Sequence, residues 1–418
     1  MSTSYKNSRL HIEDVDLSAI AGKFGTPVYC YSQTRIEDNF NAYKTALAKV
    51  TQNFTICYAC KANSNLAVLR VLQKQGAGAD IVSGGELMRA LRAKIAPGKI
   101  VYSGVGKSDT ELEYAIAHNI FQINVESAPE LETISRIAKK RKKTVNVSIR
   151  VNPNVDAKTH AKITTGKKEN KFGIDIADAP ALYARAKKLP GVNACGVAVH
   201  IGSQLTNLAP FKRAYAIVAG LVRTLRKQGH DITRVDLGGG LGIAYKDETP
   251  PDLDAYAKII KDNILPLGVH VVLEPGRYIV GDAGVLLTRV VSVKHGHDKK
   301  FLILDAAMND LIRPALYDAY HAVLPCKQAA KKTLYDVVGP VCETGDTFLV
   351  NEKLPELKAG DLVVLMTAGA YGAVMSSNYN SRPLAAEVLV KGKKFALARK
   401  IQTVEDIVAS DIIPGWAA

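Results

Sequence analysis

Four short segments of this sequence carry groups that could take part in one reaction. Lys61 directly follows an apolar run at 54–60, and a lysine that loses water there becomes less basic, so that its neutral amine can condense with an aldehyde. The segment Gly238-Gly239-Gly240-Leu241-Gly242 offers backbone N–H groups that few side chains shield, which suits a phosphate. The other two segments supply an imidazole, His200, and an acid, in Glu274-Pro275-Gly276-Arg277. Lys61 is therefore the candidate nucleophile, and the glycine segment is the candidate phosphate site.

Each of these segments also has a plain structural explanation. The glycine segment is not the dinucleotide-binding pattern G-x-G-x-x-G, because Ile243 stands where that pattern needs glycine, and by itself a flexible turn explains it equally well. A single lysine at the rim of a barrel normally extends its amine to water. The functional interpretation gains weight only if the segments meet at one place.

The elements predicted between about residues 54 and 280 bring the segments together. Short β-type runs alternate there with amphipathic helical stretches, which is typical of a parallel sheet. The predicted strands are 54–60, 79–82, 99–103, 121–125, 145–151, 194–200, 234–237 and 270–274. Their number and spacing match a (β/α)₈ barrel, and an open doubly wound sheet is the alternative. Because reactive groups of such barrels lie where the strands end, Lys61, His200, Gly238 and Glu274 are expected at one mouth.

From about residue 281 the pattern changes to valine-rich runs separated by turns. The runs are 284–294, 301–305, 361–366 and 387–390, and they predict an antiparallel β-sandwich or β-barrel domain. We therefore expect the (β/α)₈ barrel to occupy residues 26–281 and the β domain residues 282–418.

Taken together, the motifs resemble the fold-type III, alanine-racemase-like decarboxylases that use pyridoxal 5'-phosphate. The motifs of the barrel are Tyr58-Ala-Cys-Lys-Ala-Asn63, His200-Ile-Gly-Ser-Gln204, the glycine segment and Glu274-Pro275-Gly276-Arg277. The resemblance implies that Lys61 carries the cofactor as a Schiff base, that His200 stacks on its ring, and that Glu274 keeps the ring nitrogen protonated, so that the ring accepts electrons when CO₂ departs. The cofactor-binding residues that it implies are Lys61, His200, Ser203, Gly238, Gly239, Gly240, Glu274, Pro275, Gly276, Arg277 and Tyr371.

Motifs of the second domain narrow the resemblance to the diaminopimelate decarboxylase branch, which forms L-lysine and CO₂ from meso-2,6-diaminopimelate. They are Arg313-Pro-Ala-Leu-Tyr317, Gly339-Pro-Val-Cys-Glu-Thr-Gly-Asp346 and Gly369-Ala-Tyr-Gly372. The substrate-binding residues that the resemblance implies are Arg277, Arg313, Tyr317, Glu343 and Tyr371, and Cys342 is the implied proton donor to the product carbon. Two arginines suit a carboxylate, and Glu343 suits an ammonium group.

Other activities compete with this interpretation. A decarboxylase of ornithine, arginine or carboxynorspermidine shares the motifs of the barrel, but Glu343 after Cys342 favours diaminopimelate, because the ornithine relatives are expected to have an aspartate there. Alanine racemases lack the C-E-x-G-D segment. A cofactor-binding regulator without catalysis is an alternative of a different class, and Lys61, His200, Glu274 and Cys342 are the groups that such a protein would be expected to lose.

The resemblance further implies a two-fold homodimer with shared sites, and an N-terminal segment, 1–25, that packs with the β domain. The net charge is +15, but the basic runs are scattered without interleaved aromatic residues, so we expect neither a nucleic-acid nor a membrane partner. Cys57 and Cys60 form a C-x-x-C pattern inside a predicted strand, where their side chains would face opposite sides, and we expect no metal site. The polar N-terminus and the unpaired cysteine spacing predict a cytoplasmic protein.

Overall fold

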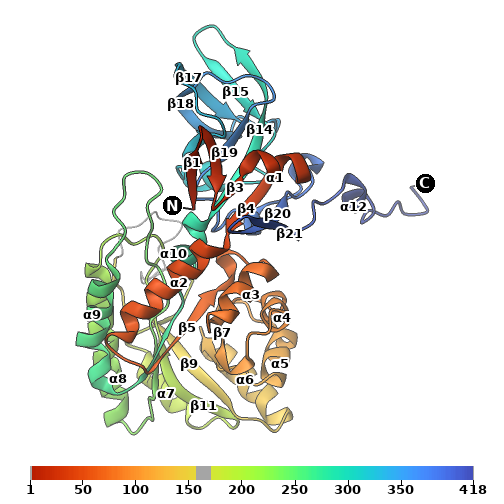
Figure 1. The fold of residues 1–418 in the computed structure, drawn as a ribbon. Coiled ribbons are helices and arrows are strands. Elements are labelled where there is room, and N and C mark those ends of the chain that lie inside the picture. Colours follow the sequence, from red (N-terminus) through yellow and green to blue (C-terminus); the bar gives the residue numbers. More distant parts are fainter. Residues whose placement is uncertain (1, 157–170, 418) are drawn as a thin grey trace. The chain divides into compact units, whose positions relative to one another are not determined.

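The computed structural model describes residues 2–156 and 171–417, which belong to two compact units (Figure 1). The first unit consists of Met1–Ile36, Tyr245–Asp247 and Val280–Ala418, and the second of Glu37–Ala244 and Glu248–Ile279. These limits differ from the predicted boundaries near residues 25 and 281. The reason for the first difference is strand β4 (Val28–Ser32), which pairs with strands of the first unit rather than with the barrel.

The second unit is the predicted (β/α)₈ barrel. Its strands are β5 (Phe54–Ala59), β6 (Gly78–Ile81), β7 (Ile100–Tyr102), β8 (Gln122–Val125), β9 (Val145–Asn152), β11 (Val192–Ala198), β12 (Arg234–Asp236) and β13 (His270–Leu273). Among the described residues these eight strands are all parallel, and the pairings of β8 with β9 and of β13 with β5 close the sheet. The closure excludes the open doubly wound sheet. The short strand β10 (Ile174–Asp175) pairs with β9 outside the closed ring.

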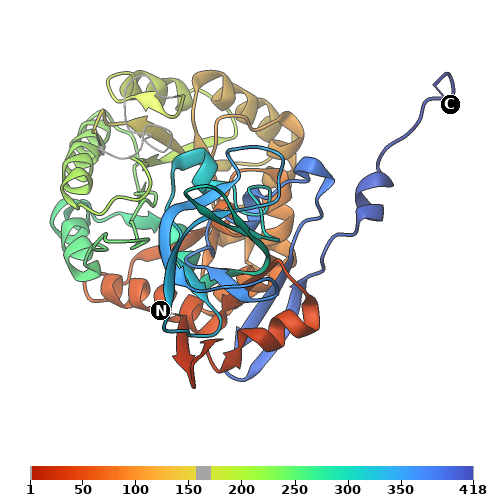
Figure 2. The same ribbon diagram turned by 90° about the horizontal axis from the view of Figure 1, so that it is seen from above.

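Helices surround the strands of this barrel, as Figure 2 shows. Their bounds are α3 (Leu66–Lys74), α4 (Gly84–Arg92), α5 (Asp109–Ala117), α6 (Ala128–Lys140), α7 (Ala179–Ala186), α8 (Ala209–Lys227) and α9 (Leu253–Asn263). Helix α5 begins with a capping box in which Ser108 and Glu111 satisfy each other's backbone N–H groups, as its sequence predicts. Two further helices, α2 (Gln33–Ala48) and α10 (Arg277–Val280), each contain a boundary between the units.

The loop Gly104-Val-Gly-Lys-Ser108, which has part of a nucleotide-binding pattern, is explained by packing. Lys107 is buried, and its Nζ lies 2.6 Å from Glu130 Oε1 and donates to the carbonyl oxygens of Gly104 and Asn124. Because three protein acceptors bind its amine, Lys107 holds this loop on helix α6 and is not available to bind a phosphate.

The first unit is built on a mostly antiparallel sheet with the order β18-β17-β15-β14-β4-β20-β21, to which β16 and β19 are attached. The strands are β14 (Gly284–His295), β15 (Lys300–Leu304), β16 (Val323–Pro325), β17 (Lys332–Val338), β18 (Thr347–Pro355), β19 (Leu362–Leu365), β20 (Ala386–Lys391) and β21 (Lys394–Arg399). The four predicted runs correspond to β14, β15, β19 and β20. Two pairings, β15 with β17 and β4 with β20, are parallel, which the short loops of the sequence do not reveal.

The N-terminal residues complete the core of the first unit. Strands β1 (Thr3–Lys6), β2 (Arg9–Ile12) and β3 (Val15–Asp16) form a small sheet, which helix α1 (Leu17–Phe24) follows. Leu10 and Ile12 pack in one buried cluster with Val285 and Val388. The same unit contains the short helices α11 (Arg313–Tyr317) and α12 (Val404–Val408). Within the described part of the chain, no helix has the length and apolarity needed to cross a bilayer.

Candidate active site

Lys61 lies in a single 3₁₀ turn, Cys60–Ala62, directly after strand β5. Its Nζ is 2.9 Å from Oδ2 of Asp80, which is the penultimate residue of the neighbouring strand β6. The Asp80 side chain is completely buried, whereas 39% of the Lys61 side chain is exposed. The lysine therefore balances a buried charge and still presents its amine to a ligand at the mouth of the barrel.

A cavity at the mouth collects three of the predicted catalytic residues. Lys61, His200 and Glu274 all line it, together with Ser103, Asn124, Arg150, Ala198, Val199 and Asp236. The structure thus brings together side chains that are more than 200 residues apart in the sequence, as the barrel topology predicts.

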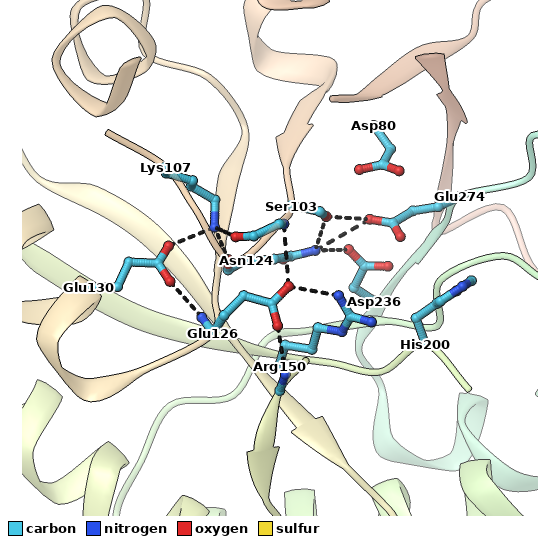
Figure 3. Close-up of polar contacts among 12 residues, drawn as sticks. Asp80, Ser103, Lys107, Asn124, Glu126, Glu130, Arg150, His200, Asp236 and Glu274 are labelled. Atoms are coloured by element: carbon cyan, nitrogen blue, oxygen red, sulfur yellow. Dashed lines mark hydrogen bonds and ion pairs between the residues drawn. The ribbon is translucent and has the colours of Figure 1, made fainter. Parts of the chain in front are cut away.

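Glu274 is the first residue after strand β13, and its carboxyl is buried among hydrogen-bond donors (Figure 3). Oε1 accepts hydrogen bonds from Ser103 Oγ and from Asn124 Nδ2, both at 3.3 Å. Burial raises the pKa of Glu274 well above its usual range, and the nearby carboxyls of Asp236 and Asp80 raise it further. An acid in these surroundings holds its proton more tightly than an exposed glutamate does.

His200 lies two residues beyond the end of strand β11 and is neutral. The backbone N–H of Gly239 donates to its Nδ1 at 3.2 Å, so the ring proton resides on Nε2. Burial, and then the positive charges of Arg150 and Lys61, lower the pKa of His200 well below its usual range. A neutral imidazole fixed by a backbone contact offers its flat face to an aromatic ring.

The glycine segment lies against the backbone of two other loops, and this close approach requires glycine. A Cβ on Gly239 would lie 2.2 Å from the carbonyl oxygen of Glu274, and a Cβ on Gly240 would lie 2.3 Å from that of Gly202. Gly240 also has a φ of 110°, a conformation that residues with a Cβ rarely adopt. The segment is therefore a fixed cradle of backbone groups, which decides against a flexible turn.

Two further residues of the predicted cofactor set meet beside this cradle. Arg277 Nη2 donates to Ser203 Oγ at 3.1 Å, although 74 residues separate them in sequence. Gly276 lets the turn approach the end of strand β5, because a Cβ there would lie 3.1 Å from that of Ala59. Pro275 contributes its carbonyl oxygen to the N–H of Ala59 at 3.1 Å. A guanidinium, a hydroxyl and glycine N–H groups are the donors that a phosphate prefers.

Five polar residues of the site were not predicted from the sequence: Ser103, Asn124, Arg150 and Asp236, which line the cavity, and Asp80, which pairs with Lys61. Arg150 forms a buried ion pair with Glu126, with Nη1 2.7 Å from Oε1. Four of the five lie within predicted strands, and the fifth, Ser103, ends one. A polar side chain at an inward position of a barrel strand is the signal that could have identified them.

Arg313 occupies a prepared position in the first unit. It is 5% exposed, its Nη1 lies 2.9 Å from Nε2 of His321, and its guanidinium lies over the ring of Tyr245, 4.6 Å from the centroid. His321 Nδ1 donates to the carbonyl oxygen of Met366, which leaves Nε2 as the acceptor for Arg313. These two contacts hold the guanidinium in one place. Tyr317 ends the same short helix and is partly buried.

Cys342 and Glu343 lie in an exposed turn whose shape depends on Asp346. The Asp346 carboxylate accepts hydrogen bonds from the N–H groups of Val341 and Met308, both at 2.7 Å. Glu343 Oε2 accepts a hydrogen bond from the hydroxyl of Tyr379 at 2.9 Å. The turn is rigid at its base, and it leaves the thiol and the carboxylate open to a ligand.

Tyr371 has a φ of 56°, a left-handed conformation that is unfavourable for a tyrosine. The glycines around it permit a tight turn, since a Cβ on Gly369 would lie 1.9 Å from the carbonyl oxygen of Val280. Strained backbone of this kind often positions a functional side chain.

The residues at the barrel mouth fit a phosphorylated pyridoxal. The amine of Lys61 suits its aldehyde, and the acid Glu274 suits its ring nitrogen. The neutral imidazole of His200 suits the face of the ring, and the glycine cradle beside Arg277 and Ser203 suits the phosphate. The architecture and these side chains define a pyridoxal-dependent enzyme of the barrel type. A family model described as "Pyridoxal-dependent decarboxylase, pyridoxal binding domain" matches residues 33–281.

The chain belongs to this family, and it is similar to diaminopimelate decarboxylases over almost its whole length. It is 50% identical to the diaminopimelate decarboxylase of Pseudomonas aeruginosa, with 98% of each chain covered, and 45% identical to that of Zymomonas mobilis, with 99% of each covered. The structure of diaminopimelate decarboxylase from M. jannaschii with L-lysine has a TM-score of 0.95 at 40% identity, and covers 100% of this chain and 99% of its own. That from Helicobacter pylori with L-lysine has a TM-score of 0.91 at 43% identity, and covers 94% and 99%.

Proposed function

We propose that this protein removes one carboxyl group of meso-2,6-diaminopimelate to give L-lysine and CO₂, the last step of lysine biosynthesis. The observation that carries the proposal is the meeting of Lys61, His200 and Glu274 in one cavity beside a glycine cradle. Bound pyridoxal phosphate would supply the electron sink that decarboxylation requires. Similarity to diaminopimelate decarboxylases at 45–50% identity supports the choice of substrate.

The side chains of the barrel divide the work of holding the cofactor. Lys61 would supply the amine that binds the aldehyde carbon, and His200 would cover one face of the ring with a neutral imidazole. Glu274 would hold a proton for the ring nitrogen. The phosphate side would be formed by three side chains, Ser203, Arg277 and Tyr371, and by the backbone of Gly238, Gly239, Gly240 and Gly276. Pro275 would fix the last turn.

The first unit supplies the groups that would select the substrate. Arg313 and Arg277 would bind the distal carboxylate, and Glu343 the distal ammonium group. Tyr317 and Tyr371 would line the same end. Cys342, an exposed thiol at the end of a rigid turn, would protonate the carbon that loses CO₂. Because His321 and Tyr245 hold Arg313 in place, a carboxylate can bind it without first ordering the side chain.

We further infer a two-fold homodimer with shared sites, located in the cytoplasm. What supports the dimer is that the cofactor lysine and the thiol belong to different units of the chain, and that Cys342 and Glu343 are exposed in theirs. Mixing Lys61→Ala and Cys342→Ala chains should restore part of the activity if each site draws on both chains. A mixture as inactive as its components would contradict shared sites.

The experiment that tests the substrate is CO₂ release by Arg313→Ala, with diaminopimelate and ornithine as alternative substrates. A charge-assisted hydrogen bond contributes about 1.5–3 kcal/mol, so kcat/KM for diaminopimelate should fall roughly 10- to 150-fold, while that for ornithine, which has no distal carboxylate, should change little. Arg289→Ala is the control, because the Arg289 side chain donates to the carbonyl oxygen of Gly360 and has no part in the proposed site. Equal losses on both substrates would contradict the role of Arg313.

The wild-type protein is measured on the same panel, with arginine and carboxynorspermidine added. Preferential release of CO₂ from one of the other substrates would replace diaminopimelate. A protein that binds pyridoxal phosphate and releases CO₂ from none of them would be a regulator rather than an enzyme.

A further inference from the structure

Asp236, the last residue of strand β12, lies in the barrel interior beneath the mouth and is 1% exposed. Its Oδ1 accepts the N–H of Gly238 at 3.0 Å, at the start of the glycine segment. Its Oδ2 accepts hydrogen bonds from Gln122 Nε2 at 3.1 Å and from Asn124 Nδ2 at 3.0 Å. Three donors from neutral groups favour the ionised form of this carboxyl.

Asn124 joins Asp236 to Glu274. Its Nδ2 donates to Oδ2 of Asp236 and, at 3.3 Å, to Oε1 of Glu274, so that one amide bridges the two carboxyls (Figure 3). Two buried carboxyls that accept from the same amide nitrogen cannot both ionise readily, because each anion raises the free energy of the other in a medium of low dielectric constant. The pair therefore holds one proton between them.

The contacts decide which of the two carboxyls keeps the proton. Asp236 accepts three hydrogen bonds at 3.0–3.1 Å, whereas the bonds from Ser103 and Asn124 to Glu274 are both 3.3 Å. The oxygen atoms of Asp236 accept more and shorter hydrogen bonds, so Asp236 is the carboxylate and Glu274 is the acid. Burial raises the pKa of both groups, and that of Glu274 more strongly.

We propose that Asp236 is a positioning residue that keeps a proton on Glu274 and directs it toward the ring nitrogen of the bound cofactor. The inference rests on the proposed function for the role of Glu274 alone. Glu274 would offer this proton to the ring nitrogen of bound pyridoxal phosphate, and the negative charge of Asp236 would favour the protonated ring.

The same carboxylate also links the two ends of the cofactor site. Through Oδ1 it fixes Gly238, where the phosphate cradle begins, and through Oδ2 and Asn124 it fixes Glu274. The spacing between the ring-nitrogen acid and the phosphate cradle thus depends on one residue. Other titratable groups that face this pair or its cavity are Asp80 on β6, Lys61 after β5, Cys57 on β5, Arg150 on β9 and His200 after β11.

The test is a pH titration of the protonated-carboxyl infrared band of the full chain, before and after loading with pyridoxal phosphate. We expect a band at neutral pH that disappears in Glu274→Gln. In Asp236→Asn the pKa of Glu274 should fall by at least about one unit, a tenfold change in proton affinity, because the neighbouring negative charge is gone. In the loaded protein, the pH at which the visible absorption band changes should fall in the same direction.

Matched variants separate this effect from general damage. Asp336→Asn, at a buried aspartate of the first unit that pairs with Lys299, should leave both titrations unchanged. If Asp236→Asn does not fold, Gln122→Met removes one hydrogen bond from Asp236 and should raise the pKa of the pair. An unchanged Glu274 titration in the variant that folds, or no such band in the wild type, would overturn the proposal. Release of CO₂ from diaminopimelate by the wild type would still support the proposed function in either case.

Discussion

Substitution of Gly239 by alanine tests how closely the glycine segment approaches the end of strand β13. The added Cβ would lie 2.2 Å from the carbonyl oxygen of Glu274 and 3.0 Å from its carbonyl carbon. Both neighbours are backbone atoms, so the clash cannot be relieved by rotating a side chain. Overpacking of this kind costs about 1–3 kcal/mol. For a unit of this size, about 1 kcal/mol corresponds to roughly 2–4 °C in Tm, so we expect Tm to fall by roughly 2–12 °C.

The assay is calorimetry of the full chain together with the affinity for pyridoxal phosphate. The matched control is Gly220→Ala, since Gly220 lies within helix α8 and its added Cβ meets nothing within 4 Å. Alanine is favoured over glycine in a helix by about 1 kcal/mol, so the control should raise Tm by roughly 2–4 °C and leave the affinity unchanged. If Gly239→Ala melted like the control and bound the cofactor like the wild type, the close approach and the cradle argued from it would both be refuted.

Two further predictions concern buried charges. The pKa of Glu274 is raised in the folded protein, so its stabilising effect is present below about pH 4.3, the pKa of an unfolded glutamate, and is lost as pH rises through the folded pKa. Cofactor-free Glu274→Gln lacks this loss. Its free energy of unfolding should therefore increase relative to that of the wild type by up to about 1.4 kcal/mol for each pH unit above about 4.3. Urea unfolding at several pH values checks this, and a difference independent of pH would contradict it. Lys107→Met leaves Glu130 without its buried partner and should cost about 3–5 kcal/mol, whereas Lys258→Met, at an exposed pair with Asp262, should cost under about 0.5 kcal/mol. Equal changes in Tm would refute the assignment of Lys107 to packing.

The barrel could be predicted from the sequence because its signal is local and repeated. Each strand is a short apolar run, each is followed by an amphipathic helix, and turn and capping residues mark the limits, as Ser108 and Glu111 do for α5. Topology then placed Lys61, His200 and Glu274 at one mouth, because the ends of parallel strands meet there. Their common cavity confirms this part of the site geometry.

What the sequence did not show depends on contacts between distant segments. Strand β4 falls within residues 26–281, the range predicted for the barrel, yet it pairs with β14 and β20, which begin more than 250 residues later. The parallel pairing of β15 with β17 is equally invisible to local pattern. The hydrogen bonds of Asp236 to Gln122, Asn124 and Gly238 could not be assigned, since an aspartate inside a short strand has no periodic or motif signal.

Charge pairing explains how this barrel keeps polar groups in its interior. Asp80, Asp236 and Glu274 are all buried near one end of the sheet, where three free carboxylates would oppose folding. Asp80 is neutralised by Lys61 at 2.9 Å, and Asp236 is joined to Glu274 through the amide of Asn124. The first arrangement holds the amine that we propose binds an aldehyde, and the second involves the acid that we propose faces a ring nitrogen. The interactions that make these charges tolerable to the fold would therefore also place the two ends of the cofactor's ring.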